Sequence, residues 1–266
     1  MELRQMIFMK LPPRDLTKCR LICRQWNFDI LDDNMLMKKI WSYIRASYCI
    51  QKAKYGNIEF FSALTEFAID PNPANNTGVT PLHEAARNGH LEVCRLIQDT
   101  IEDQNPAGEC GETPLHWAAM SGQLEVCHLI LDRCEDPNPA DNGDMTPFHW
   151  AARRGHLEVC CLILDKCDDK NPAGRRGETP LHTAAQEGYL EVCRLIMERC
   201  EDQNPADEYG QTPLHLAAGG GHHDVCRLIL ERCEDKNPAD EDGETPLEFA
   251  SSCGHHEIVE LIRSYI

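Results

Sequence analysis

Most of this sequence repeats itself with a period of 33 residues. The dipeptide Thr-Pro recurs at that spacing at Thr80, Thr113, Thr146, Thr179, Thr212 and Thr245. So regular a period predicts a stacked array, because one short unit cannot bury its apolar face alone. We number the Thr-Pro units one to six, at 80–112, 113–145, 146–178, 179–211, 212–244 and 245–266. The last of these is expected to be a C-terminal capping repeat, and an atypical N-terminal capping unit is expected at 47–79.

Each unit predicts a pair of helices. The threonine is a good helix N-cap, and proline suits the first helical position, where its missing N–H is not needed. In unit one, Leu82, Ala85 and Ala86 form a narrow apolar stripe, and Gly89 ends the helix. The segment LEVCRLI at 91–97 predicts a second helix between neighbouring units. The acidic, proline-containing link that follows predicts a turn or short hairpin, here called the finger, before the next Thr-Pro.

Cysteine and histidine recur at fixed positions of the unit. Apolar residues replace the cysteines in the outer units, which predicts reduced cysteines that pack as small hydrophobic side chains. The histidine two places after each proline predicts a structural hydrogen bond to the cap threonine or to the next unit. A zinc site needs several ligands that converge, and these residues form a ladder instead. Without a motif for catalysis, we expect no catalytic residue, metal or cofactor.

The motifs TPLH, the paired alanines, the glycine and LEVC, at this period, resemble ankyrin repeats, strongly over 80–266 and weakly over 47–79. The resemblance implies an all-α solenoid of antiparallel helix pairs, with short β-hairpin or turn fingers and a concave protein-binding face. Asp144 stands where other fingers carry glycine, for example Gly111 and Gly177. Because Asp tolerates a left-handed backbone less well than Gly, we expect the third finger to differ in shape.

Charge divides the chain into two parts. The net charge is -18, yet residues 1–46 hold nine lysines and arginines against five acidic residues, a net of +4 that leaves −22 for the rest. Acidity of this size argues against nucleic-acid or anionic-membrane partners. The sequence contains no apolar run long enough to cross a bilayer and no signal-peptide pattern, so we expect a cytoplasmic or nuclear protein.

The basic segment 1–46 predicts helices, which a simple cap for the array would also have. Its pattern Ile7-Phe8, Leu11-Pro12, Asp15-Leu16, Cys19-Arg20, Ile22-Cys23-Arg24 and Trp26 resembles an F-box. The resemblance implies docking on the small acidic adaptor of cullin-RING ubiquitin ligases, through Leu3, Ile7, Phe8, Leu11, Pro12, Leu16, Cys23 and Trp26. The opening Leu-Pro of the family pattern would fall at or before Met1, which leaves two interpretations, a truncated start or weakened adaptor binding.

These resemblances lead to two hypotheses for function. The first is a non-catalytic substrate receptor of a ubiquitin ligase, which binds the adaptor through 1–46 and a target protein on the ankyrin concave face. The second is an ankyrin scaffold without a ligase role, whose first helices are a cap or a decayed F-box. Co-purification of the adaptor separates the two. A third hypothesis, a metalloenzyme that uses the cysteine and histidine positions, is disfavoured because packing explains those positions, and metal analysis of the purified protein tests it.

Residues that vary from unit to unit predict where the target binds. Arg153-Arg154 follow the paired alanines of unit three, and Arg175-Arg176 occupy the tip of the fourth finger. We expect stacking to bring these four arginines together, where they suit an acidic or phosphorylated segment of the target. Trp117, Met120, Met145 and Trp150 give this basic patch an apolar flank. The alternative is that the arginines only neutralise an acidic array.

Overall fold

The computed structural model describes residues 46–66 and 70–266. The chain divides into Met1–Arg45 and Ala46–Ile266, and the second of these contains every described residue. It begins with a helical stretch at 46–54 and helix α4 (Ile58–Glu66), which form a helix pair without a Thr-Pro start. Within the described residues the regular structure is entirely helical, and none of these helices has the length and apolar content needed to cross a membrane.

Each Thr-Pro unit then contributes one inner and one outer helix. The inner helices start at the proline and are α5 (Pro81–Arg87), α7 (Pro114–Met120), α9 (Pro147–Arg154), α11 (Pro180–Glu187), α13 (Pro213–Gly220) and α15 (Pro246–Ser252). The outer helices are α6 (Leu91–Gln98), α8 (Leu124–Leu131), α10 (Leu157–Lys166), α12 (Leu190–Arg199), α14 (His223–Arg232) and α16 (His256–Arg263). The predicted all-α ankyrin solenoid is confirmed.

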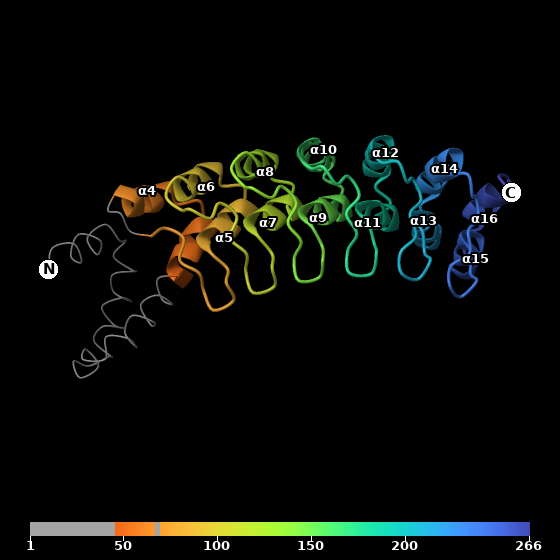
Figure 1. The fold of residues 1–266 in the computed structure, drawn as a ribbon, viewed down its shortest axis with the longest axis horizontal. Helices are drawn as coiled ribbons and strands as arrows, with labels where there is room; N and C mark the ends of the chain where they lie inside the picture. Colours follow the sequence, from red (N-terminus) through yellow and green to blue (C-terminus); the bar gives the residue numbers. More distant parts are fainter. Residues whose placement is uncertain (1–45, 67–69) are drawn as a thin grey trace. The chain divides into compact units, whose positions relative to one another are not determined.

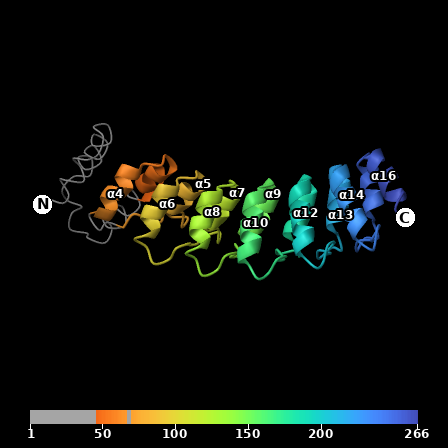
Figure 2. The same cartoon turned by 90° about the horizontal axis from the view of Figure 1, so that it is seen from above.

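The helices of the array lie in two rows. In Figure 1 the inner helices follow one another beneath the outer helices, and the finger loops project from the side of the inner row. Figure 2 shows the outer row, with α6, α8, α10, α12, α14 and α16 side by side. Each inner helix packs against the inner helix of the next unit and against its own outer helix. The surface formed by the inner row and the finger bases is therefore assembled from consecutive units.

The repeated histidine joins each unit to the next. The backbone N–H of Thr146 donates to His149 Nδ1 over 3.1 Å, and the His149 Nε2–H donates to the carbonyl oxygen of Glu178 in the following finger over 3.0 Å. An amide can only donate and a carbonyl can only accept, so these partners fix the tautomer with its proton on Nε2. The same pair of bonds recurs at His83, His116, His182 and His215. The predicted structural role of this column is confirmed, with both proposed partners present.

A second contact between units requires glycine. Gly122 follows the inner helix of unit two with φ 70°, in the left-handed region that favours glycine. A Cβ atom there would lie 2.6 Å from Nδ1 of His156, which belongs to the next unit. The His156 ring occupies this space because its Nε2–H donates to the carbonyl oxygen of Met120 over 3.2 Å. The glycine therefore ends one helix and admits the side chain that links the next unit.

The cysteine column lies in the core between inner and outer rows. Cys94, Cys127, Cys160, Cys193 and Cys226 are fully buried, as is Phe61 at the same position of the capping unit. Burial raises the pKa of Cys94 and of Cys127 to about 12, which keeps both thiols protonated. Their burial among apolar residues confirms the predicted packing role. All cysteines in the described residues are free thiols.

The third finger keeps the same turn as the other fingers, although Asp144 replaces the usual glycine. Asp144 takes φ 59°, and its N–H donates to Asp141 O over 2.9 Å, matching the bond from Gly111 to Gly108 in the second finger. The expected change of shape within this turn is therefore wrong. The difference lies in how the finger joins the next one. Backbone bonds such as Asn142 N to Cys110 O link other successive fingers, whereas Arg175 Nη2 donates to Asn142 O at this step.

Candidate functional site

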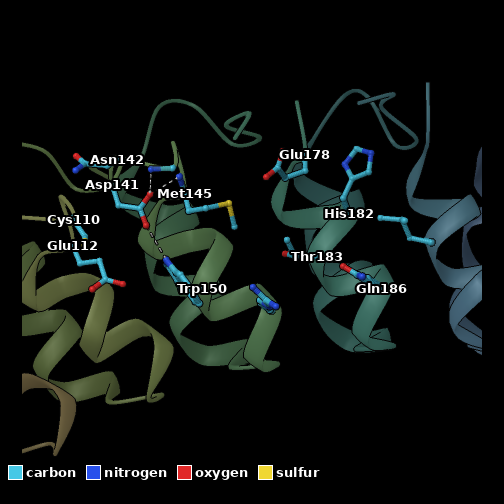
Figure 3. Close-up of a pocket in the computed structure, with 13 residues that line it drawn as sticks. Cys110, Glu112, Asp141, Asn142, Met145, Trp150, Glu178, His182, Thr183 and Gln186 are labelled. Atoms are coloured by element: carbon cyan, nitrogen blue, oxygen red, sulfur yellow. Dashed lines mark hydrogen bonds between the residues drawn. The ribbon is translucent and has the colours of Figure 1, made fainter. Parts of the chain in front are cut away.

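A pocket of about 570 Å³ opens on the inner surface around Trp150 of unit three and Thr183 of unit four, with neighbouring units completing its wall. Its apolar wall comes from Met145, Trp150 and Leu216. Figure 3 shows Trp150 on one helix and Thr183 and Gln186 on the next, with Met145 reaching from the finger base toward the second helix. A hollow of this size with apolar walls and a few polar groups is the usual form of a recognition site.

Helix α9 presents its pocket residues because of its periodicity. Phe148, Ala151 and Ala152 are buried against the array, so the opposite face of the helix points away from the core. Trp150 lies on this open face, half-buried, and Arg153 follows one turn later, exposed. The Trp150 indole N–H donates to Asp141 Oδ2 over 3.4 Å, which links the ring to the base of the finger.

Three of the predicted target-binding residues, Met145, Trp150 and Arg153, line this pocket. Trp117 lies one unit away, where its Nε1–H donates to Glu112 Oε2 over 3.2 Å and the Arg87 guanidinium lies 5.7 Å from its ring centroid. Met120 is half-buried on the same helix. Neither Trp117 nor Met120 is part of the pocket wall.

The structure does not gather the four arginines around one partner. Arg153 lies over the Trp150 ring at 5.7 Å, with Glu187 at 3.9 Å from its Nε. Arg175 reaches back to the third finger, where Asp144 Oδ2 is 4.0 Å from its Nε. Arg176 lies over the Tyr209 ring at 5.9 Å. Arg154 is exposed, and its side chain makes no hydrogen bond or ion pair within the described part of the chain.

Other lysines and arginines pair with acidic residues of the array. Ion pairs between consecutive outer helices join Arg133 to Asp99, Lys166 to Asp132, Arg199 to Asp165 and Arg232 to Glu198, at 2.7 to 3.3 Å. Arg153, Arg154, Arg175 and Arg176 lie outside this ladder. Their ion pairs, at 3.9 and 4.0 Å, are at the limit of direct contact. This difference favours an external partner for them over simple neutralisation.

Sequence reasoning missed the polar part of the pocket, formed by Glu112, Asp141, Glu178, Thr183 and Gln186. A signal for it was present in the repeat. Four places after each cap threonine, the six units carry Glu84, Trp117, Trp150, Thr183, Leu216 and Phe249. Thr183 is the small residue of this series, between two bulky ones in neighbouring units.

The predicted adaptor-binding residues lie outside the described residues. They are Leu3, Ile7, Phe8, Leu11, Pro12, Leu16, Cys23 and Trp26. Their assignment therefore rests on the sequence and on the comparison that follows.

Comparison with family models covers both parts of the chain. The model described as "Ankyrin repeats (3 copies)" matches residues 47–141, 98–176, 133–207 and 199–265. The model described as "F-box-like" matches residues 1–42. No curated protein matches the sequence.

Proposed function

The chain belongs to the ankyrin-repeat family and carries an F-box-like domain, and we propose that it is the substrate-recognition subunit of a cullin-RING ubiquitin ligase. Both kinds of domain bind other proteins and are typically non-catalytic. One would hold the ligase adaptor and the other the protein to be modified. We place this activity in the cytoplasm or nucleus, where such ligases act.

The observation that carries the proposal is the pairing of the two matches in one chain. The F-box-like match ends at residue 42 and the ankyrin match begins at residue 47. The charge changes sign over the same division, from +4 in residues 1–46 to −22 in the rest. A basic segment suits an acidic adaptor, and an acidic array keeps other acidic proteins from binding without a specific basic site.

We propose that apolar side chains of the first segment anchor the adaptor. Ile7, Leu11, Pro12 and Leu16 are the expected centre of the contact, with Leu3, Phe8, Cys23 and Trp26 around them. Interfaces of this kind depend on a few well-buried apolar anchors, so a charge placed among them is costly. Residues 14–55 contain neither glycine nor proline, so the sequence has no glycine-rich flexible linker between the two matches. A target held by the same chain as the adaptor has a raised effective concentration at the ligase.

The test is a pull-down of the purified adaptor with the full-length chain. Leu11→Asp combined with Leu16→Asp should abolish capture. Lys38→Gln combined with Lys39→Gln lowers the net charge equally but leaves the anchors, so it should keep capture, with a modest weakening at low salt that disappears as salt rises. If the intact chain captures no adaptor, and a version extended upstream of Met1 captures none either, the receptor function is wrong. A chain that still holds a target would then be a scaffold.

We propose that the target docks across units three and four with an acidic or phosphorylated segment. Arg153, Arg154, Arg175 and Arg176 supply the positive charge, and Trp117, Met120, Met145 and Trp150 supply apolar contact. The exposed Arg154, whose side chain makes no ion pair within the described part of the chain, supports this placement, as do the long ion pairs of Arg153 and Arg175. Arginine beside tryptophan is a frequent composition of interface hot spots.

A further inference from the structure

The pocket between units three and four exists because of one small residue. Trp150 and Leu216 occupy the same position of units three and five, and Thr183 occupies it in unit four. Thr183 is 8% exposed, and its hydroxyl donates to Pro180 O over 2.9 Å inside its own helix. The space that a large side chain fills in the neighbouring units is therefore left open, with an indole ring on one side and a leucine on the other.

The walls of this pocket are negatively charged. Glu112, Asp141 and Glu178 line it against a single guanidinium, that of Arg153. The histidine in the wall, His182, adds no charge at neutral pH, because burial lowers its pKa. The pocket therefore has a net negative charge beside an apolar surface.

The three carboxylates have hydrogen-bond donors but no cation. Two backbone amides, those of Gly143 and Met145, donate to Asp141 Oδ1, and Trp150 donates to its Oδ2. The other two carboxylates each have one assigned donor, Trp117 Nε1 at Glu112 Oε2 and the Arg176 N–H at Glu178 Oε2. None of the three forms a salt bridge within the described part of the chain. Each retains lone pairs for a further donor.

We propose that this pocket receives one arginine side chain of the target, an inference that rests on the proposed role as a target-binding array. The aliphatic part of the arginine packs against Met145 and Leu216, and its guanidinium lies beside Trp150 and the carboxylates. Arginine suits such a site because its planar group binds carboxylates through paired hydrogen bonds and stacks on aromatic rings. The acidic residues of the same target segment contact Arg154 and Arg175, which are outside the pocket wall.

The test selects displayed random peptides against the full-length chain and two variants. Thr183→Leu fills the pocket with the side chain that unit five carries at this position. Glu178→Gln removes one carboxylate from the pocket and copies Gln211, which precedes the cap threonine of the next unit. Both changes copy a neighbouring unit, so folding should be preserved, and circular dichroism checks it. Glu244→Gln, the same position in front of unit six and outside the pocket, is the matched control.

We expect peptides selected on the wild-type chain and on the Glu244→Gln control to share an arginine at one position. Replacing that arginine by citrulline, which has nearly the same shape but no charge, should weaken binding about tenfold or more. Thr183→Leu should lose the preference for arginine, and Glu178→Gln should reduce it. A consensus of apolar or acidic residues, equal binding of the citrulline peptide, an unchanged preference in Thr183→Leu, or no selected peptide at all would each overturn the inference.

Adaptor binding is measured on the same variants and keeps the two proposals apart. If the wild-type chain captures the adaptor but selects no arginine-containing peptides, only the pocket assignment is overturned. An arginine preference in a chain that captures no adaptor would remove the ligase role and leave the pocket assignment intact.

Discussion

The interior between units and the inner surface of units three and four follow opposite rules. In the interior, the same threonine, histidine and cysteine recur, and the same bonds join one unit to the next, as His149 and His182 show. On the inner surface, the corresponding position changes from Trp150 to Thr183 to Leu216. The interior residues serve stability, because each must fit an identical neighbour. The surface residues have no such constraint, so their differences point to a partner.

Acidification should have the largest effect on the interior, since it acts on several units at once. Burial lowers the pKa of His83 and of His149 to about 4, although hydrogen bonds to Glu112 O and Glu178 O oppose the shift. The unfolded chain binds these protons from about pH 6.5 downward, so stability is complete above that pH and falls toward pH 4. Each of the two contributes a loss of at most about 1.4 kcal/mol per pH unit in that window. Urea denaturation across this range measures the loss, and folded-state titration of either ring near pH 6.5 by NMR would contradict it.

A charge in the cysteine column should be the most damaging single substitution. Cys160 is fully buried, and an aspartate there must lose its hydration or become protonated, at a cost of about 4 kcal/mol or more. Cys160→Val, which copies Val259 of the last unit, should cost about 1.5 kcal/mol at most. Equal stability of the two variants in urea denaturation would show that the column is not a packing position. A stoichiometric metal or native disulfide found by mass spectrometry would show the same.

Removing one histidine should lower the free energy of unfolding by less than a buried charge does. The loss should be larger where the side chain bridges two units than where it caps only its own helix. His149→Ala leaves the Thr146 N–H and the Glu178 carbonyl without their partner, which we expect to cost about 3 kcal/mol. Glu248 holds the same position in unit six, where it accepts from the Thr245 N–H and hydroxyl in its own unit. Glu248→Ala should therefore cost only about 1 kcal/mol, as for a helix cap. Similar losses of unfolding free energy in the two variants would refute the bridging role.

Reversing charge on the arginines of the inner surface should change binding and leave stability nearly unchanged. Arg154→Glu combined with Arg175→Glu should eliminate capture of the target recovered by affinity purification under proteasome inhibition. Both residues are exposed, so the free energy of unfolding should shift by about 0.5 kcal/mol or less. Wild-type capture should weaken as salt rises. The control, Arg199→Glu with Arg232→Glu, makes the same charge change on the outer helices and should still capture the target. If the Arg154→Glu, Arg175→Glu variant also captures the target, these arginines only neutralise the acidic array and do not bind the target.

Much of this protein was accessible from its sequence, because a repeat tests each position several times. The Thr-Pro start, the buried histidine and the cysteine each recur from unit to unit. In the outer units an apolar residue replaces the cysteine and Glu248 replaces the histidine, so the roles of these positions followed from periodicity and elementary helix chemistry. The same comparison identified Trp150 and Arg153 as surface residues. The F-box-like segment was also found in the sequence, as a pattern of spaced apolar and basic residues.

The tertiary structure decided what several units build together. Asp144 keeps the turn of the third finger, because φ 59° is accessible to aspartate when its own N–H closes the turn on Asp141. The separate partners of Arg153 and Arg175 depend on how adjacent fingers and helices are offset. The pocket at Thr183 needs three successive units to exist, and its carboxylates come from three different fingers. A sequence gives the residue types at each position, but the distance between side chains of different units is set only when the units stack.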